Sequence, residues 1–294
     1  MCDRLERTWK NKPVTEPSAP EPASIAVAIP CYNEAAALPV VIAAWREALP
    51  QAEIVVFDNN STDSSAEIAR GLDARVVPVP EQGKGNVVRT IFATFARHDF
   101  VVLVDGDGTY PADRVHSLLA PMLAGDADMA VGGRQPVDQP GAMTPVRGLG
   151  NVLIRAGFNL LIGHGQGDLL SGYRVFNRRF RQAVTLRSSG FEIETELSSQ
   201  ALVRGLRVVE VAVPYYPRIA GTQSKLRAFH DGLRILRTIF SQSLRHSYRI
   251  PLATFLALLI VFAPYVAMVP VTFRLLAYFV VVLALVLCER LARR

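Results

Sequence analysis

The stretch "VVLVDGDGTYPADRV", residues 101–115, places two aspartates directly after a run of β-forming residues. Asp105 and Asp107 follow this apolar run, each with a glycine after it. Two interpretations fit: a surface turn, or a pair of carboxylates beside one hard cation. Mg²⁺ and Mn²⁺ prefer such oxygen ligands and share them with substrate phosphates. A D-x-D pair alone favours a turn, so the rest of the chain has to decide.

Apolar segments of strand length alternate with helix-like segments through the first half of the chain. The strand-like segments are "SIAVAIP" (24–30), "EIVVFD" (53–58), "ARVVPV" (74–79), "FVVLVD" (100–105) and "ADMAVGG" (127–133), with helix-like stretches at 35–48, 64–72, 85–98 and 111–123. This order predicts an α/β domain with a mostly parallel sheet, in which ligands bind at the carboxyl ends of the strands. Polar residues gather at such ends, at Asn33 and Glu34, at 58–63, and at Asp105 and Asp107. Their convergence predicts a site.

The second half of the chain is less regular. Residues 150–163 and 191–205 have helical character, and 206–216 that of a strand. The segment 224–249 carries apolar residues at helical spacing, namely Leu226, Phe229, Leu233, Leu236, Ile239, Phe240 and Leu244, with Arg227, Arg234, Arg237 and Arg245 between them. This pattern predicts a basic amphipathic helix on a bilayer surface. An ordinary helix that covers the sheet stays an alternative.

The end of the chain has the composition of membrane helices. Half of the 294 residues are hydrophobic and the mean hydropathy is +0.23. The excess lies in 250–270 and 273–288, each near the roughly 20 residues that cross a bilayer, and neither shows the polar stripe of a soluble helix. Arginines flank the outer ends of this predicted two-helix hairpin, which favours a multi-pass protein of the inner or plasma membrane with both ends and the domain before them in the cytoplasm.

These features divide the chain into segments. We expect a flexible tail over 1–22, an α/β domain over 23–222, amphipathic interfacial helices over 223–249, two transmembrane helices over 250–289 and a basic cytoplasmic end over 290–294. The net charge of +6 favours anionic lipid headgroups, because the arginines cluster beside the predicted spans. No nucleic acid is expected, since no face alternates aromatic and basic residues.

Two loops of the first half carry candidate binding residues. "DNNSTD", residues 58–63, offers hydrogen-bonding partners for a nucleoside, namely Asp58, Asn59, Asn60, Ser61 and Asp63, although helix capping alone accounts for Thr62 or Asp63. "EQGKGNVV", residues 81–88, places Lys84 between two glycines at a helix start, where phosphates bind readily. It lacks the spacing of a P-loop, which excludes that class of nucleotide hydrolase.

Taken together, these motifs resemble the family 2 glycosyltransferases of the GT-A fold, a Rossmann-like α/β architecture. The resemblance is carried by "AIPCYNE" (28–34), "VFDNNSTD" (56–63), "EQGKGN" (81–86) and "VDGDGTYP" (104–111), in that order. The later "DLLSGYRVF" (168–176), "FEIETEL" (191–197) and "YYPRIAGTQSKL" (215–226) are similar to the branch that moves a sugar onto a polyprenyl phosphate, such as dolichyl-phosphate mannose synthases. The resemblance as a whole covers about residues 24–230.

The resemblance implies a role for each matched residue. Nucleotide binding falls to Pro30, Tyr32, Glu34, Asp58, Asn60, Lys84 and Asp105, and the metal, Mg²⁺ or Mn²⁺, to Asp105 and Asp107. Diphosphate or acceptor binding falls to Arg134, Ser171, Arg174, Arg218, Ser224 and Lys225, and Glu194 lies near the sugar. The residues expected to take part in catalysis are Asp107, Asp168, Arg174 and Arg134. Thr109 stands where relatives often have Gln or Ser, which leaves a third metal ligand open.

The implied function is an inverting, metal-dependent hexosyltransferase. It would move a hexose from a UDP- or GDP-linked sugar to undecaprenyl or dolichyl phosphate and give a β-linked product. Because the acceptor is already an anion, it needs positioning more than deprotonation, so Asp168 as a general base is a loose hypothesis. A hydroxyl acceptor on a lipid or glycan, and a membrane scaffold that binds nucleotide without turnover, stay as alternatives. The sequence leaves a homo-oligomer open.

Overall fold

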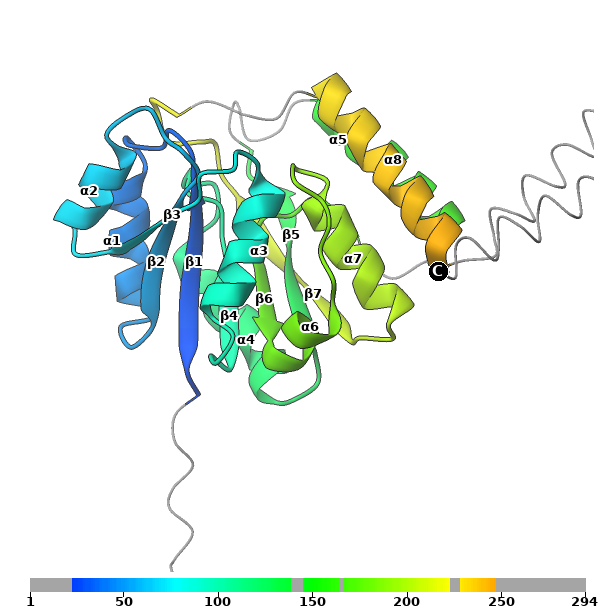
Figure 1. The fold of residues 1–294 in the computed structure, drawn as a ribbon, viewed down its shortest axis with the longest axis horizontal. Coiled ribbons are helices and arrows are strands. Elements are labelled where there is room, and N and C mark those ends of the chain that lie inside the picture. Colours follow the sequence, from blue (N-terminus) through cyan, green and yellow to red (C-terminus); the bar gives the residue numbers. More distant parts are fainter. Residues whose placement is uncertain (1–22, 139–144, 164–166, 223–227, 247–294) are drawn as a thin grey trace, which may run out of the picture.

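The computed structural model describes residues 23–138, 145–163, 167–222 and 228–246, which fold around one sheet (Figure 1). Its seven strands lie in the order β3-β2-β1-β4-β6-β5-β7. Their bounds are β1 Ile25–Cys31, β2 Glu53–Asp58, β3 Arg75–Pro78, β4 Phe100–Leu103, β5 Met129–Pro136, β6 Arg174–Asn177 and β7 Val208–Tyr215. The predicted mostly parallel sheet is confirmed, since β6 alone in this sheet runs antiparallel to its neighbours.

Helices cover both faces of the sheet. They are α1 Leu38–Ala48, α2 Ser65–Gly71, α3 Lys84–Thr94, α4 Val115–Leu123, α5 Pro145–Leu161, α6 Arg178–Ala183, α7 Ile193–Val203 and α8 Ala228–His246, with a 3₁₀ turn, η1, at Ala112–Arg114. One core joins α1, α2 and α4 to one face, and a second joins α3, α6 and α7 to the other. Side chains alternate between these cores along β1, where Val27 and Ile29 enter the first and Ala26 and Ala28 the second.

The outermost layer is the pair α5 and α8, which lies beyond α7 in Figure 1. Ile235 and Ile239 of α8 are buried against Phe158 and Ile162 of α5. The opposite side of α8 leaves Leu233, Leu236, Phe240 and Leu244 exposed. The helix therefore covers the protein with one apolar face and presents another outward. The sequence grouped Ile239 with the apolar residues of a helix on the bilayer surface, but its side chain belongs to the inner face.

Strand β6 was missing from the sequence prediction. It has only four residues, "RVFN", and every one of its partners lies far away in sequence, on β4 and β5. No alternation of polar and apolar residues marks so short a strand, because it is buried between two neighbours. Strand β6 matters for the site because the segment 167–173 leads directly into it and β6 lies in the middle of the sheet.

Several expectations concern residues that the structure does not describe. These are the tail 1–22, the spans in 250–289, the basic end 290–294, and the candidate site residues Ser224 and Lys225. Within the described ranges, no helix combines the length and the apolar character that a membrane crossing needs.

The start of strand β5 holds a buried carboxylate that ties three strands together. Asp128 accepts hydrogen bonds from the Arg207 amide before β7 (2.9 Å) and from Asn177 Nδ2 at the end of β6 (3.0 Å). Burial works against its charge, but these donors and the nearby Arg179 and Arg207 hold the pKa of Asp128 below its usual value. A carboxyl group with a lowered folded pKa contributes stability above its unfolded pKa and loses that contribution as the pH falls.

We therefore expect Asp128→Asn to lower the free energy of unfolding by about 1–3 kcal/mol at neutral pH. The deficit relative to the native chain should begin to shrink as the pH falls below about 4, the unfolded pKa of an aspartate, and its charge-dependent part should be lost as the pH passes the lowered folded pKa. Thermal melting at several pH values measures this. Asp126→Asn, an exposed carboxylate in the same turn, is the control. An equal deficit at all pH values would show that charge is not the cause.

Candidate active site

The two aspartates lie where the chain leaves β4. The Val104 amide still donates to Ala28 O of β1 (3.1 Å), and the chain then turns, with Asp107 buried and Asp105 partly exposed. Gly108 has a φ of +76°, and a Cβ there would lie 2.4 Å from Ile219 Cδ1. Glycine is therefore required at this turn, which explains why the pattern looks like a surface turn although it is packed against residue 219.

Asp105 shares a lysine with a second carboxylate. Lys84 Nζ, at the first residue of α3, lies 2.5 Å from Asp105 Oδ1 and 2.6 Å from Glu194 Oε1 in the first turn of α7. Glu194 is buried, and only 9% of the Lys84 side chain is exposed. The bridge joins the end of β4 to the starts of two helices that are more than a hundred residues apart in sequence.

The electrostatics of this bridge follow from burial and mutual charge. Burial lowers the pKa of a lysine, but Asp105 and Glu194 outweigh it and raise the pKa of Lys84. Burial likewise opposes the charge of Asp105, yet Lys84 holds the pKa of that carboxyl below its usual value. For Glu194 burial prevails, and its pKa is raised in spite of Lys84. Lys84 is thus a permanent positive charge between two carboxyl groups.

Asp107 has a different set of partners. Its Oδ1 accepts hydrogen bonds from the Thr109 hydroxyl (2.7 Å) and the Thr109 amide (3.0 Å), and its Oδ2 lies 2.6 Å from Arg218 Nη1. The Ile219 amide donates to the Asp107 carbonyl (3.2 Å), which holds residues 218–219 beside the aspartates. Thr109 therefore orients Asp107.

The pair of carboxylates fits a divalent metal ion. Burial first and the charge of Asp105 second raise the pKa of Asp107, although Arg218 works against them. A cation held by both groups would relieve this repulsion, and their oxygens are ligands that Mg²⁺ and Mn²⁺ accept. Within the described ranges no cluster of three or more His, Cys, Asp or Glu could hold a metal ion. Further ligands would then come from water or substrate phosphates.

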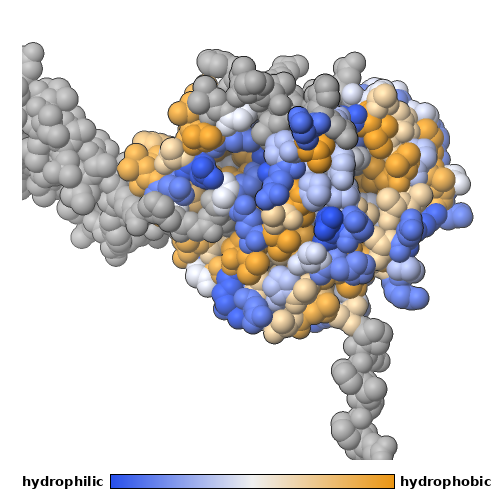
Figure 2. Space-filling view, turned by 180° about the vertical axis from the view of Figure 1, so that it is seen from behind, coloured by the Kyte–Doolittle hydropathy of each residue, from blue (hydrophilic) through white to orange (hydrophobic). Residues whose placement is uncertain are grey.

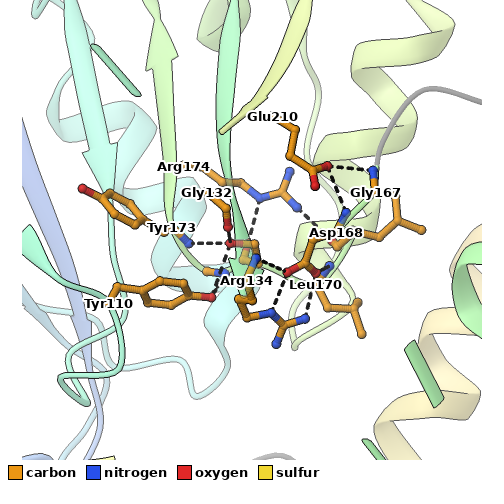
Figure 3. Close-up of polar contacts among 12 residues, drawn as sticks. Tyr110, Gly132, Arg134, Gly167, Asp168, Leu170, Tyr173, Arg174 and Glu210 are labelled. Carbon is orange, nitrogen blue, oxygen red and sulfur yellow. Dashed lines mark hydrogen bonds and ion pairs between the residues drawn. The ribbon is translucent and has the colours of Figure 1, made fainter. Parts of the chain in front are cut away.

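A second group of site residues is built on β5, β7 and the segment 167–173 (Figure 3). Arg134 of β5 forms a two-pronged ion pair with Asp168, from Nε to Oδ2 (2.6 Å) and from Nη2 to Oδ1 (2.7 Å). Glu210 of β7 accepts from the amides of Gly167 (2.7 Å) and Asp168 (3.0 Å). Burial opposes the charge of Asp168, but Arg134 holds the pKa of this carboxyl below its usual value, so it is a weak base.

Ser171 and Arg174 hold the segment 167–173 in place through hydrogen bonds. The Ser171 hydroxyl donates to Gly132 O (2.6 Å) and lies 3.3 Å from the Tyr110 hydroxyl. Arg174 is fully buried and donates to Ser171 O (3.0 Å), Leu169 O (2.8 Å) and the Ser198 hydroxyl (3.0 Å). This geometry favours a positioning role over phosphate contact for Arg174. Because Gly172 has no side chain, the segment approaches Asp105: a Cβ there would lie 2.2 Å from Asp105 Oδ2.

The residues predicted for the nucleotide lie at the ends of β1 and β2. Pro30 is in β1, Tyr32 and Glu34 follow it, and Asp58 ends β2. The two loops are joined by Asn33 Oδ1, which accepts from the Thr62 amide (2.7 Å), and Asp63 caps the start of α2 through the Ser65 amide (3.0 Å). Asn60 has a φ of +63°, a conformation that asparagine tolerates.

Sequence reasoning missed Glu210 and the structural role of Asn59, which it offered only as a hydrogen-bonding partner for a nucleoside. Asn59, beside the predicted Asn60, donates to Val79 O (3.0 Å) and Glu81 O (2.7 Å) and accepts from the Gly83 amide (2.7 Å), so it sets the turn before Lys84. The doubled asparagine was a signal, but the sequence does not tell which one faces inward. Glu210 had no such signal, because it is one charged residue in an ordinary strand pattern.

Comparison with known proteins agrees with this geometry. A family model described as glycosyl transferase family 2 matches residues 26–184, from β1 to the end of α6. The chain belongs to glycosyl transferase family 2. It is 37% identical to glycosyltransferase AglJ of Haloferax volcanii over 72% of this chain and 70% of that one. It is 30% identical to the polyprenol monophosphomannose synthase of Mycolicibacterium smegmatis over 66% of this chain and 78% of that one.

A solved structure shares the fold. Glucosyl-3-phosphoglycerate synthase from Mycobacterium tuberculosis, in complex with Mn²⁺ and UDP-glucose, matches with a TM-score of 0.58 and 22% identity over 76% of this chain and 78% of that one. The matched family region contains Asp105, Asp107 and Asp168. Glu194, Glu210 and Arg218 lie beyond it, so the part of the site that they build rests on this chain's own geometry.

The Lys84 bridge makes a prediction about stability. Lys84→Met leaves the buried Glu194 and the partly exposed Asp105 without their cation, and we expect it to lower the free energy of unfolding by about 3–5 kcal/mol. The double variant Lys84→Met/Glu194→Gln, measured by thermal melting, should regain at least about 1 kcal/mol of that loss. If the two substitutions were simply additive, Lys84 and Glu194 would not be coupled as the 2.6 Å contact indicates.

Proposed function

We propose that this chain transfers a hexose from a nucleotide sugar to a polyprenyl phosphate at a membrane surface and gives a β-linked product by inversion. The observation that carries the proposal is the aspartate pair set among basic side chains. Lys84 contacts Asp105, Arg218 contacts Asp107, and Arg134 is held nearby on β5. A site of this kind binds a diphosphate through a metal ion on one side and a second phosphate through arginines on the other.

The donor side is built to stabilise a leaving group. Asp105 and Asp107 would hold Mg²⁺ or Mn²⁺, which, when bound, supplies Lewis-acid charge neutralisation for the leaving nucleoside diphosphate. Lys84 stays charged between its carboxylates and adds a fixed positive charge beside Asp105. Asn59 and Gly83 fix the turn from which Lys84 extends, so this charge needs no reorganisation during the reaction. The donor complex of the solved neighbour with Mn²⁺ and UDP-glucose supports such a donor.

The acceptor side has arginines and lacks a free base among its described carboxylates. Both carboxylate oxygens of Asp168 accept hydrogen bonds from Arg134, and Asp107 forms an ion pair with Arg218. A hydroxyl acceptor needs its proton removed, whereas a phosphate monoester is already an anion and needs alignment with the anomeric carbon. The site therefore supports a phosphate acceptor better than a hydroxyl. The printed name of the Mycolicibacterium smegmatis relative, a polyprenol monophosphomannose synthase, points the same way.

The outer helices support a membrane location for the acceptor. Among the described residues, most exposed large hydrophobic side chains lie on α5 and α8, namely Val152, Leu153, Leu160, Leu233, Leu236, Phe240 and Leu244. Figure 2 shows hydrophobic surface along the edge of the molecule where α5 lies. Exposed Arg155 and Arg237 border this face and suit anionic headgroups. We propose that it lies on the bilayer and that residues 250–289 cross it, with the catalytic domain on the cytoplasmic side.

The test is a transfer assay on full-length protein in detergent with undecaprenyl phosphate. A panel of UDP- and GDP-linked hexoses, with Mg²⁺ or Mn²⁺ and with chelator, should yield a lipid-phosphate sugar from one donor. We expect chelator to abolish the product and Asp107→Asn to lower turnover by about 100-fold or more, because the leaving group loses its charge stabilisation. Metal-dependent nucleotide binding without any product would instead support another acceptor or a binding-only protein.

The ion pair at Asp168 makes a separate kinetic prediction. Asp168→Asn keeps the shape of the carboxyl group but weakens its hold on Arg134, so we expect turnover to fall about 3- to 20-fold by loss of positioning. The pH profile of the remaining activity should keep its shape, since Asp168 is not the group that titrates. Loss of a general base would cost about 100-fold or more and remove the acid limb of the profile, and that result would contradict the positioning role.

A further inference from the structure

The segment Ser188–Gly190, just before α7, lies directly against the first turn of α3. The Gly85 amide donates to Ser189 O (2.9 Å), and Arg89 Nη1 donates to Ser188 O (2.6 Å). A Cβ on Gly83 would lie 2.2 Å from Ser189 O, and one on Gly85 would lie 2.1 Å from Ser188 O. The glycines on both sides of Lys84 are therefore needed for this contact as well as for any phosphate, and the segment fixes the backbone that carries Lys84.

The other side of this segment faces α8. Arg234 donates through Nη2 to the Ser189 hydroxyl (3.0 Å) and to Glu192 Oε1 (2.8 Å). It also packs on Gly190, where a Cβ would lie 3.0 Å from Arg234 Nη1. Two turns further along α8, Gln242 reaches Glu196 Oε1 (3.4 Å), and the other oxygen of Glu196 accepts from the Ser188 amide (2.8 Å). The segment is thus held between α3 and α8.

Glu192 shows why Arg234 matters more than an ordinary surface arginine. Its carboxyl group is buried, and Oε1 accepts from the Gly190 amide (3.1 Å) and from Arg234. Its Oε2 is buried without a hydrogen-bond partner within the described residues. A buried carboxylate with one ion-pair partner depends strongly on that partner. Sequence reasoning placed Arg234 among the arginines of a lipid-facing helix, whereas in the structure its side chain points to Glu192.

We propose that Arg234 is a positioning residue for the donor site: through Ser189 and Glu192 it fixes the start of α3 and the start of α7, and so the position of Lys84. Both elements that locate the ammonium group are involved, since Lys84 begins α3 and Glu194 lies two residues after Glu192. The helix whose outer face we assign to the bilayer thereby also sets the geometry of nucleotide binding. The kinetic part of this inference rests on the proposed function, whereas the structural part does not.

The experiment compares Arg234→Met, the conservative Arg234→Lys and the control Arg70→Met in the full chain in detergent. Arg70 is an exposed arginine on α2, on the opposite face of the sheet, so its removal changes net charge equally. Amide hydrogen exchange over residues 83–89 is measured without ligand. Steady-state kinetics then give KM for the nucleotide sugar, KM for undecaprenyl phosphate, and kcat.

For Arg234→Met we expect exchange over 83–89 to accelerate about 10-fold, since the acceptor of the Gly85 amide is released. KM for the nucleotide sugar should rise about 5- to 20-fold, with kcat and the acceptor KM within about 2-fold, because donor binding loses a positioned charge. Arg234→Lys should recover most of both effects by keeping the charge beside Glu192, and Arg70→Met should match the native chain.

Unchanged exchange over 83–89 in Arg234→Met would overturn the inference, as would equal effects in Arg70→Met. A change confined to kcat or to the acceptor KM would overturn it too, because a loss of overall packing, not of donor positioning, would then be the cause. If the native chain transfers no sugar, the proposed function fails while the exchange comparison still decides whether Arg234 fixes the start of α3.

Discussion

The site depends on one interaction, the bridge in which Lys84 joins Asp105 to Glu194. The bridge connects the end of β4, the start of α3 and the start of α7. These three places meet only when the sheet and the helices on its α3 and α7 face are both assembled. Burial works against all three charges: Lys84 and Asp105 hold their charge through mutual attraction, whereas burial prevails at Glu194 and raises its pKa. Removal of Lys84 would leave two carboxyl groups without their cation, so the site forms only when all three elements are in place.

The same bridge bears on how the site would hold a metal ion and a diphosphate. Asp105 contacts Lys84 and Asp107 contacts Arg218, so part of the charge of the two carboxylates is compensated before a donor arrives. A metal ion bound by both carboxylates would add positive charge while Lys84 and Arg218 stay in place beside them. The charge stabilisation of a leaving group would then be preorganised.

How far the sequence predicts this structure differs between its parts. The alternation of strands and helices up to β5, and the gathering of polar residues at strand ends, follow from local patterns and were predictable. Strand β6 was not, because its four residues pair with partners far away in sequence. Asn59, Glu210 and the inward turn of Arg234 share that cause: each is one residue in an ordinary local pattern whose role depends on what the tertiary fold places opposite it.

Helix α7 shows why such long-range polar contacts are a requirement of the fold. Nearly all of α7 is buried, including polar residues that an amphipathic helix would expose. Ser198 accepts from Arg174, Gln200 pairs with the backbone of Thr185, and Glu196 accepts from the amides of residues 187 and 188. A buried polar group without a partner costs about 1–3 kcal/mol, so each of these contacts selects one arrangement of the segments around the helix. The helix thus sets the positions of the segment under Asp168, the segment beside Lys84 and the outer helix α8, which hydrophobic packing alone would leave free to shift.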